Sequence, residues 1–520
     1  MSLDELYSKL WKVANKLRGS MDPGEYKNII LGLIFLKYVS DKFNVIYNNL
    51  EKKYSDPKSS DYESNQEERK ALLEDRDVYI SEGVLFLPKE ARYEYFIDNM
   101  ANPQLAKIID DAMDIIEKNE PRFKGILPKV YVEYSRQLDY KKLGEIVRIF
   151  GEIGFHGGEA DSIDVLGKIY EYFIGKFAEI GGGEFYTPSC IVQILVEILE
   201  PYEGRVFDPA CGSGGMFIQS AKFLEKQNKS IDKISIYGQE ANYTTWKLVR
   251  MNLEIRGINS QNIKYGDSYL DDKHQGLKAD FVIANPPFND SDWGANHLGD
   301  NDVRLKYGLP PANSANFMWI QHFLHHTAEN GKAGFVMANR AMSSNTNAEY
   351  AIRKGMIEDD KIDVMISLPP KLFMNFKGPV TLWFLTNNKT NPKYRNRKGE
   401  TLFIDARNEF EKVSSALNEI KQHQIEKIVN TVRAYRGEEG YEQYEDIAGF
   451  CKVVKIEDIA KSDYVLTPGR YVGTEAVEDD GIPFEEKMAG FSADLREMFA
   501  RNKELEAKLK ENFKELGFEI

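Results

Sequence analysis

The chain has 520 residues, of which 42% are hydrophobic and 29% charged, and its formal net charge at pH 7 is −14. This composition is typical of a globular protein of about three domains, and an acidic chain is by itself a poor nonspecific binder of DNA, because neutralisation of phosphates drives that binding. No basic leader and no apolar run of membrane length are evident in the sequence, so no membrane contact is expected. Three cysteines without CxxC spacing favour a reducing, cytoplasmic setting and argue against a structural zinc site.

Residues 1–155 are predicted to form an N-terminal helical domain. Asp22, Pro23 and Glu25 form the pattern of a helix start, and an apolar helix is expected from Tyr26 to Phe43. This region has no pattern of catalytic residues, so packing or docking of a partner is its expected role.

Residues 156–475 are predicted to form the catalytic domain. An amphipathic helix over residues 163–180 is followed by three glycines and by residues 184–188, which read Glu-Phe-Tyr-Thr-Pro. Thr187 or Ser189 is expected to cap a second helix, which reaches Glu200. A hydroxyl-capped helix start is suited to a carboxylate, although a flexible linker would also be rich in glycine.

Residues 205–217 predict a strand, a tight glycine-rich turn and a helix, the first unit of a nucleotide-binding α/β fold. The glycines fall at 212, 214 and 215, which matches neither the G-x-G-x-x-G fingerprint nor the P-loop. Asp208 at the strand end would repel a pyrophosphate and attract an ammonium or sulfonium group. S-adenosylmethionine is therefore a better candidate ligand than NAD.

Three further predicted strands end in polar residues. The strands at 233–238, 263–266 and 281–284 lead to Glu240, Asp267 and Asn285. A carboxylate at the tip of the second strand suits ribose hydroxyls. Because the carboxyl ends of parallel strands share one edge of a sheet, Asp208 and these three residues are expected to lie at one ligand-binding edge.

The sequence Asn285-Pro286-Pro287-Phe288 is suited to holding a flat base that carries an exocyclic amine. The prolines stop the strand and stiffen the backbone. The Asn285 side-chain oxygen and the Pro286 carbonyl can accept from an NH2 group, and Phe288 can stack on the ring. An ordinary Asn-Pro turn would have the same sequence.

Two features after Phe288 admit a functional and a structural explanation. The polar loop 289–312 is long enough to be a lid over DNA or over the target base. His322, His325 and His326 have the i, i+3, i+4 spacing of a metal pair on a helix. The glutamate of H-E-x-x-H and a third ligand are not evident, so no metal is expected.

Further strands are predicted at 334–338 and 362–368, followed by a pair of strands at 381–386 and 401–405. The basic loop 387–400 between that pair has either a phosphate-binding role or the role of a solvated hairpin loop. After about residue 450 the chain is expected to become a tail, and residues 476–520 to be a helical segment for subunit contact. Its apolar residues recur at nearly heptad spacing and predict a partner: Phe491, Leu495, Met498, Leu505, Leu509, Phe513 and Leu516.

Six segments together resemble the methylation (modification) subunit of type I restriction–modification systems, a gamma-class N6-adenine DNA methyltransferase. They are residues 10–22, 31–38, 183–188 (GEFYTP), 208–215 (DPACGSGG), 285–288 (NPPF) and 468–471 (PGRY). The resemblance covers nearly the whole chain, and the order of GEFYTP, glycine-rich loop and NPPF is similar to the gamma arrangement. It implies an α/β, Rossmann-like, S-adenosylmethionine-dependent methyltransferase domain with an N-terminal helical domain and a C-terminal helical tail.

The resemblance also implies binding residues and partners. The residues expected to bind S-adenosylmethionine are Gly183, Glu184, Phe185, Tyr186, Thr187, Pro188, Gly212, Ser213, Gly214 and Gly215, with Asp208, Glu240 and Asp267 at the strand ends. Two such subunits are expected to join one specificity subunit on double-stranded DNA, and restriction (translocase) subunits to join for cleavage. Cys211 departs from the small residues usual in this loop and is expected to be tolerated.

These features predict methyl transfer to the N6 amine of an adenine flipped out of the duplex, with Asn285 and Pro286 accepting from the amine. The sequence has no Pro-Cys dipeptide, which argues against C5-cytosine chemistry through a thiolate. Three alternatives remain: a protein glutamine-amide methyltransferase, a type IIG-like fusion, for which the tail leaves no room, and a catalytically silent scaffold.

Overall fold

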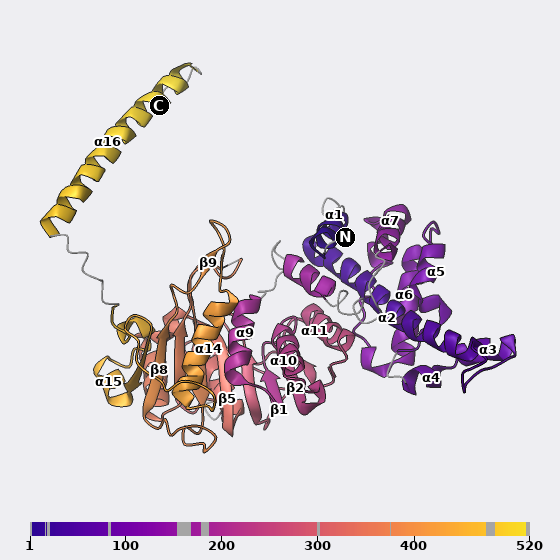
Figure 1. Ribbon diagram of the computed structural model, residues 1–520, viewed down its shortest axis with the longest axis horizontal. Helices are drawn as coiled ribbons and strands as arrows, with labels where there is room; N and C mark the ends of the chain where they lie inside the picture. Colours follow the sequence, from indigo (N-terminus) through magenta and orange to yellow (C-terminus); the bar gives the residue numbers. More distant parts are fainter. Residues whose placement is uncertain are drawn as a thin grey trace. The chain divides into compact units, whose positions relative to one another are not determined.

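The computed structural model describes residues 3–15, 17, 21–81, 85–152, 168–177, 187–298, 302–374, 376–474 and 484–515. Within the unit that ends at Gly473, a helical region precedes an α/β domain, and a second compact unit begins at Thr474 (Figure 1). Among the described helices, none combines the length and the apolar character needed to cross a membrane.

The N-terminal region is helical, as predicted. Its helices are α1 (Leu3–Ala14), α2 (Pro23–Ser55), α3 (Gln66–Leu73), α4 (Arg76–Ser81), α5 (Tyr93–Asp98), α6 (Leu105–Asn119) and α7 (Tyr140–Gly151). At the predicted start of α2, the Asp22 N–H donates to Glu25 Oε2 at 3.0 Å. The apolar core of this region includes Met251 and Ile255 of α11 (Tyr243–Ile255), and the Tyr38 hydroxyl donates to the Ile255 carbonyl, so the region is packed onto the α/β domain.

The α/β domain is built on a nine-stranded sheet of order β3-β2-β1-β4-β5-β7-β6-β8-β11. The strands are β1 (Gly204–Asp208), β2 (Ile234–Glu240), β3 (Ile263–Tyr265), β4 (Ala279–Ala284), β5 (Thr327–Ala338), β6 (Ile362–Ser367), β7 (Val380–Thr386), β8 (Glu400–Asp405) and β11 (Cys451–Lys455). The first five are mutually parallel, β7 is antiparallel to β5 and to β6, and β11 is antiparallel to β8. A separate small ladder pairs β9 (Glu411–Lys412) with β10 (Asn418–Glu419).

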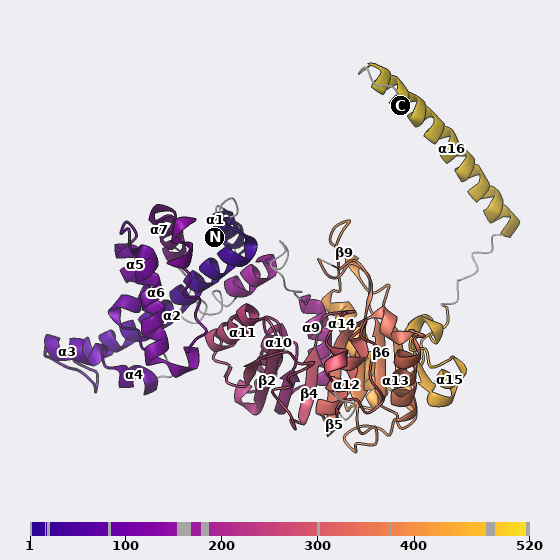
Figure 2. The same ribbon diagram turned by 180° about the vertical axis from the view of Figure 1, so that it is seen from behind.

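Helices cover both faces of the sheet (Figures 1 and 2). On one face lie α9 (Ser189–Leu199), α10 (Gly215–Lys226) and α14 (Gln422–Arg436), and on the other lie α12 (Asn316–His326) and α13 (Asn347–Glu358). Along β4, the Ile283 side chain packs on the face covered by α9, α10 and α14. Val282 and Ala284 pack on the face covered by α12 and α13, as the alternation of side chains along a strand requires. The domain is therefore the Rossmann-like α/β fold that the sequence predicts.

The topology corrects two predictions about the C-terminal half. The strands β7 and β8 do not pair with each other, because β6 lies between them in the sheet. Residues after 450 do not become a tail at once: β11 completes the sheet, α15 (Ile456–Lys461) follows it, and Leu466 is fully buried. A strand of five residues with only partial alternation gives too weak a sequence signal to be recognised.

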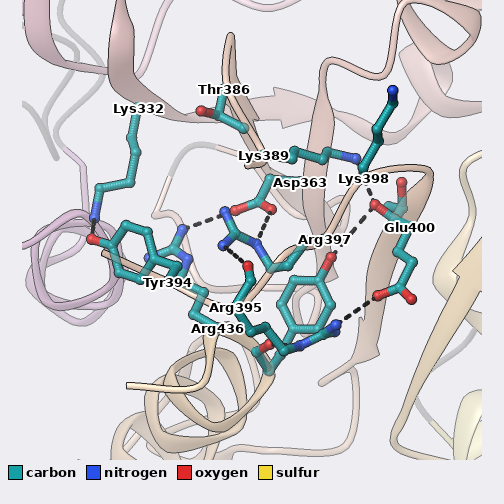
Figure 3. Close-up of polar contacts among 12 residues, drawn as sticks. Lys332, Asp363, Thr386, Lys389, Tyr394, Arg395, Arg397, Lys398, Glu400 and Arg436 are labelled. Carbon is teal, nitrogen blue, oxygen red and sulfur yellow. Dashed lines mark hydrogen bonds and ion pairs between the residues drawn. The ribbon is translucent and has the colours of Figure 1, made fainter. Parts of the chain in front are cut away.

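The basic loop 387–400 is largely folded into the domain. Lys389 and Arg397 are only 4% and 2% exposed. Arg397 Nε donates to Asp363 Oδ1 at 3.0 Å, and Arg436 of α14 donates to the other oxygen at 3.2 Å (Figure 3). Arg395 is paired with Glu400 at 2.9 Å. These contacts favour a structural role for three of the five cations in the loop, whereas Lys393 and Lys398 are exposed.

The second unit contains one long helix, α16 (Phe484–Glu515). Four apolar side chains of its predicted stripe are more than half exposed: Leu495, Met498, Leu505 and Leu509. The Phe491 side chain and Leu516 lie outside the described residues. The helix thus exposes a row of apolar side chains between charged ones.

Candidate active site

The glycine-rich loop joins β1 to α10 at the carboxyl edge of the sheet. Gly212 and Gly214 have φ angles of 50° and 85°, which lie in the left-handed region that favours glycine. A Cβ on Gly214 would lie 2.8 Å from Val249 of α11, so this glycine also permits close packing of the loop on that helix. Within the described part of the chain, a Cβ on Gly212 or Gly215 would meet no atom within 4 Å, so open space lies beside both.

Two polar side chains hold this loop in place. Glu240 Oε2 accepts from the Gly212 N–H at 3.0 Å, and Asn252 of α11 donates to the Ser213 carbonyl at 2.7 Å. Asn252 is 2% exposed and was not predicted, because a single asparagine in an amphipathic helix carries no local signal. Cys211 is buried, which raises the pKa of its thiol, so it behaves as a small packing residue.

A pocket opens between this loop, the start of α9 and the end of β4. Six of the predicted site residues line it: Thr187, Asp208, Gly212, Ser213, Gly215 and Asn285. Its other lining residues are Glu171, Ser189, Val192, Ala210, Cys211, Met216 and Gln219. Three segments that the sequence singled out separately, from 187, 208 and 285, therefore share one cavity.

The other predicted cofactor residues either do not line the pocket or are not among the described residues. Gly183, Glu184, Phe185 and Tyr186 are not among the described residues. Pro188, rather than Thr187 or Ser189, is the N-cap of α9, and no side chain caps that helix. Gly214 is the N-cap of α10. Glu240 and Asp267 are bound to nearby backbone N–H groups, those of Gly212 and Asn242 for Glu240 and that of Tyr269 for Asp267.

The pocket combines a buried acid with two helix starts. Asp208 is 1% exposed, and burial raises the pKa of its carboxyl well above the ordinary value, with a further contribution from the charge of Glu240. The helices α9 and α10 both begin at the pocket, and their N-terminal ends carry a partial positive charge. An acid for an ammonium group and helix starts for a carboxylate suit the amino-acid portion of S-adenosylmethionine.

Asn285 lies at the tip of β4, and the two ends of its side-chain amide have different surroundings. Its Nδ2 donates to Thr187 Oγ1 at 2.8 Å. Its Oδ1 is buried and has no hydrogen-bond partner among the described residues. Such an oxygen is costly unless a donor reaches it, so it marks a place where a ligand amine would bind.

Phe288, three residues further on, is half-buried in an aromatic cluster. Its ring centroid lies 6.3 Å from that of Phe373 and 5.7 Å from that of Phe376, both in the connection between β6 and β7. Pro286 is buried and Pro287 is exposed. The two further phenylalanines were not predicted, because they are more than 80 residues away in the chain.

The histidines of α12 meet a third group that the sequence did not reveal. One ring nitrogen each of His322 and His326 and one carboxylate oxygen of Asp272 lie within 4.8 Å of one another. His326 Nε2 is 3.1 Å from Asp272, and its Nδ1 donates to the Leu277 carbonyl at 2.9 Å. Since the Arg304 guanidinium lies 3.2 Å from His322 Nδ1, a further cation is disfavoured, and a buried Asp272–His326 hydrogen bond explains the cluster better than a metal centre.

This fold, with a glycine-rich loop, a buried acid and an Asn-Pro-Pro-Phe strand end around one pocket, defines a Rossmann-like amino-methyltransferase. The family model described as N-6 DNA Methylase matches residues 161–480, and the HsdM N-terminal domain matches residues 6–150. The chain therefore belongs to the family of type I restriction enzyme methylase subunits, which are adenine-specific N6 DNA methyltransferases.

Individual relatives agree with this assignment. The type I restriction enzyme MjaIX methylase subunit of Methanocaldococcus jannaschii is 45% identical over 99% of this chain and 92% of its own length. The HindI methylase subunit of Haemophilus influenzae is 45% identical over 80% of this chain and 93% of its own. A crystal structure of a type I restriction–modification methyltransferase subunit from Streptococcus thermophilus is 25% identical, with a TM-score of 0.74, over 91% of this chain and 100% of that one. This family membership removes the glutamine-amide and type IIG-like alternatives.

Proposed function

We propose that this chain binds S-adenosylmethionine in the pocket at the carboxyl edge of the sheet and presents the N6 amine of a flipped adenine to it. One observation carries the proposal: the Asn285 Oδ1 is buried, has no hydrogen-bond partner among the described residues, and belongs to a residue that lines the same pocket as Asp208 and Gly212. An acceptor for an amine thus adjoins a site suited to a zwitterionic amino acid.

The residues at the cofactor end of the pocket have complementary roles. Asp208 would bind the ammonium group, and the N-terminal ends of α9 and α10 would bind the carboxylate. Gly212 and Gly215 leave open space into which a ligand fits. When bound, S-adenosylmethionine supplies a methyl group on a positively charged sulfur. We also propose that Glu240 reaches the ribose and that residues 183–188 complete the pocket, as the resemblance implies.

The residues at the base end activate the amine. Asn285 Oδ1 and the Pro286 carbonyl would accept the two N6 hydrogens, which draws the nitrogen lone pair out of conjugation with the ring and makes the nitrogen nucleophilic. Phe288, supported by Phe373 and Phe376, would stack on the base. The nitrogen would form a bond to the methyl carbon as the carbon–sulfur bond breaks and its electron pair stays on sulfur, and one N6 proton would pass to water. The protein forms no covalent bond to the base.

We further propose the assembly that the family resemblance implies: two of these chains with one specificity subunit on double-stranded DNA, joined by restriction (translocase) subunits for cleavage. The net charge of −14 supports a partner that supplies much of the DNA contact. The exposed stripe of α16 supports a helical contact with another subunit.

Replacing the Asn285 amide tests the proposal directly. The chain is purified with the subunits that accompany it, and methyl transfer is measured on genomic DNA amplified in vitro, which carries no N6-methyladenine. Asn285→Ala is expected to abolish transfer while calorimetry finds the S-adenosylmethionine affinity unchanged. The exposed Asn408→Ala is the matched control and keeps full activity. Undiminished transfer by Asn285→Ala refutes the assignment, and a wild-type complex that binds no S-adenosylmethionine would be the silent scaffold.

A further inference from the structure

Thr187 and Asn285 are 98 positions apart in the chain, yet their side chains are hydrogen-bonded at one wall of the pocket. The Asn285 Nδ2 donates to Thr187 Oγ1 at 2.8 Å, and both residues line the cavity. The contact leaves Oδ1 as the free end of the amide, buried and without a partner among the described residues.

The orientation of this amide decides whether it can bind an amine. The O and NH2 ends of an asparagine side chain are similar in shape, so rotation by half a turn about the terminal torsion has little steric cost. In the reversed orientation, an NH2 group would face the N6 amine, and two donors cannot form a hydrogen bond. A hydroxyl can both donate and accept, so the Thr187 hydrogen bond restricts the rotation and position of the amide, and the orientation with Oδ1 toward the pocket is the one in which Nδ2 donates to Thr187.

The Thr187 hydroxyl is itself held in a restricted position. Thr187 precedes Pro188, which restricts its backbone, and its branched side chain restricts its own χ1 rotation. The α9 N-cap is Pro188, and the Thr187 hydroxyl makes no cap to that helix. The hydroxyl is therefore not required for the start of α9, although a cap is the role that the sequence predicts for it.

We propose that Thr187 is a positioning residue for methyl transfer, whose hydroxyl holds the Asn285 amide with Oδ1 directed at the amine of the base. This inference rests on the proposed function of Asn285 and adds a second residue to it. It also assigns to Thr187 a role in the chemical step, which is distinct from the cofactor contact that the family resemblance implies.

The isosteric variant Thr187→Val removes the hydroxyl and keeps the shape. Its kcat for methyl transfer to amplified, unmethylated genomic DNA is expected to fall about tenfold or more, because small errors in the position of a reacting group are costly. The unfolding temperature is expected to stay at the wild-type value, and the Kd for S-adenosylmethionine is expected to rise by a smaller factor than that by which kcat falls. Thr187→Ser keeps the hydroxyl and is expected to restore most of kcat. Thr431→Val, which removes a hydroxyl from the exposed side of α14, is the control and keeps wild-type kcat.

The outcomes for the single variants separate this inference from the proposed function. Wild-type kcat in Thr187→Val, a serine variant as slow as the valine variant, or a weaker Kd with kcat intact would each overturn the inference and leave the role of Asn285 standing. Full activity of Asn285→Ala would instead overturn the proposed function.

Discussion

Glu240, the last residue of β2, accepts a hydrogen bond at 3.0 Å from the backbone N–H of Gly212 in the loop after β1. Its second oxygen accepts from the Asn242 N–H at 2.8 Å. The carboxylate therefore fixes the shape of the glycine-rich loop, a role that is separate from the ribose contact proposed for it.

Glu240→Ala is expected to weaken S-adenosylmethionine binding about 10- to 100-fold, because hydrogen bonds to a charged acceptor contribute about 1.5–3 kcal/mol. Glu240→Gln keeps one acceptor oxygen and is expected to give an intermediate Kd by calorimetry. Glu225→Ala, an exposed substitution on α10, is the control and leaves the Kd unchanged. If Glu240→Ala and the wild type bind S-adenosylmethionine with equal affinity, the loop keeps its conformation without the hydrogen bonds to Glu240.

Asp208 is expected to reduce the stability of the cofactor-free protein at high pH, and the ammonium contact proposed for it would offset that cost. Burial is the main cause that raises the folded-state pKa of Asp208, so protonation of Asp208 stabilises the folded protein relative to the unfolded protein. This stability is fully present below the unfolded-state pKa, near about 4, and is lost as pH rises through the folded-state pKa. Asp208→Asn is therefore expected to raise the unfolding temperature of the cofactor-free protein at pH 8 by about 1–3 °C. The gain is expected to shrink as the pH falls toward about 4.

The same substitution is expected to weaken S-adenosylmethionine binding at least about tenfold at pH 8, because the ammonium group loses its counter-charge. Wild-type affinity is expected to decline as the pH is lowered and Asp208 is protonated, whereas that of Asp208→Asn changes little. Calorimetry across this pH range measures both. A variant that is less stable than wild type at pH 8, or that binds with wild-type affinity, contradicts the assignment.

Local sequence patterns were sufficient to predict which polar residues lie at the strand ends. Asp208, Glu240, Asp267 and Asn285 each follow a short apolar run, and the parallel order of β1 to β4 places them at one edge of the sheet. The glycine spacing at 212, 214 and 215 located the turn into α10. These signals lie within a few residues of the positions that they describe.

Contacts between distant segments had no such signal. The fold brings together three pairs of residues that are distant in the sequence: Asp272 and His326, Phe376 and Phe288, and Asn252 and Ser213. The burial of Arg397 was unpredictable for the same reason, since it requires β6 to lie between β7 and β8 and to present Asp363. A basic loop has the same kind of sequence whether its cations are exposed to water or paired with a buried carboxylate, so the sequence alone does not distinguish the two cases.

The α16 unit is expected to be dispensable for folding and cofactor binding but necessary for assembly. A chain ending at Gly473 keeps the whole sheet and both of its helical layers, because α16 belongs to a different compact unit. Its unfolding temperature and Kd for S-adenosylmethionine are expected to match those of the full chain, while co-purification with the specificity subunit is lost.

Two paired variants localise the contact on α16. Leu505→Asp/Leu509→Asp changes the exposed apolar stripe and is expected to abolish co-purification, whereas Glu504→Ala/Glu506→Ala, on neighbouring polar positions, is expected to preserve it. A chain ending at Gly473 that still binds the specificity subunit would place the contact elsewhere on the molecule.

Asp363 holds two buried guanidinium groups, those of Arg397 and Arg436, and all three side chains are at most 2% exposed (Figure 3). Burial by itself would raise the pKa of Asp363, but the two arginines and Lys389 outweigh it and lower the pKa. Asp363→Asn would leave both arginines without a buried counter-charge, so it is expected to reduce the free energy of unfolding by about 3–5 kcal/mol.

The pH dependence gives this prediction a second test. A carboxyl with a lowered folded-state pKa contributes stability above its unfolded-state pKa, near about 4, and loses it only as the pH falls through the folded-state value. The difference between wild type and Asp363→Asn in urea unfolding is therefore expected to be constant from pH 6 to 8 and to narrow in acid. Asp111→Asn removes an exposed pairing with Lys107 and is expected to have no measurable effect. Equal stability of Asp363→Asn and the Asp111 control would mean that water or a rearranged acid reaches the two guanidinium groups.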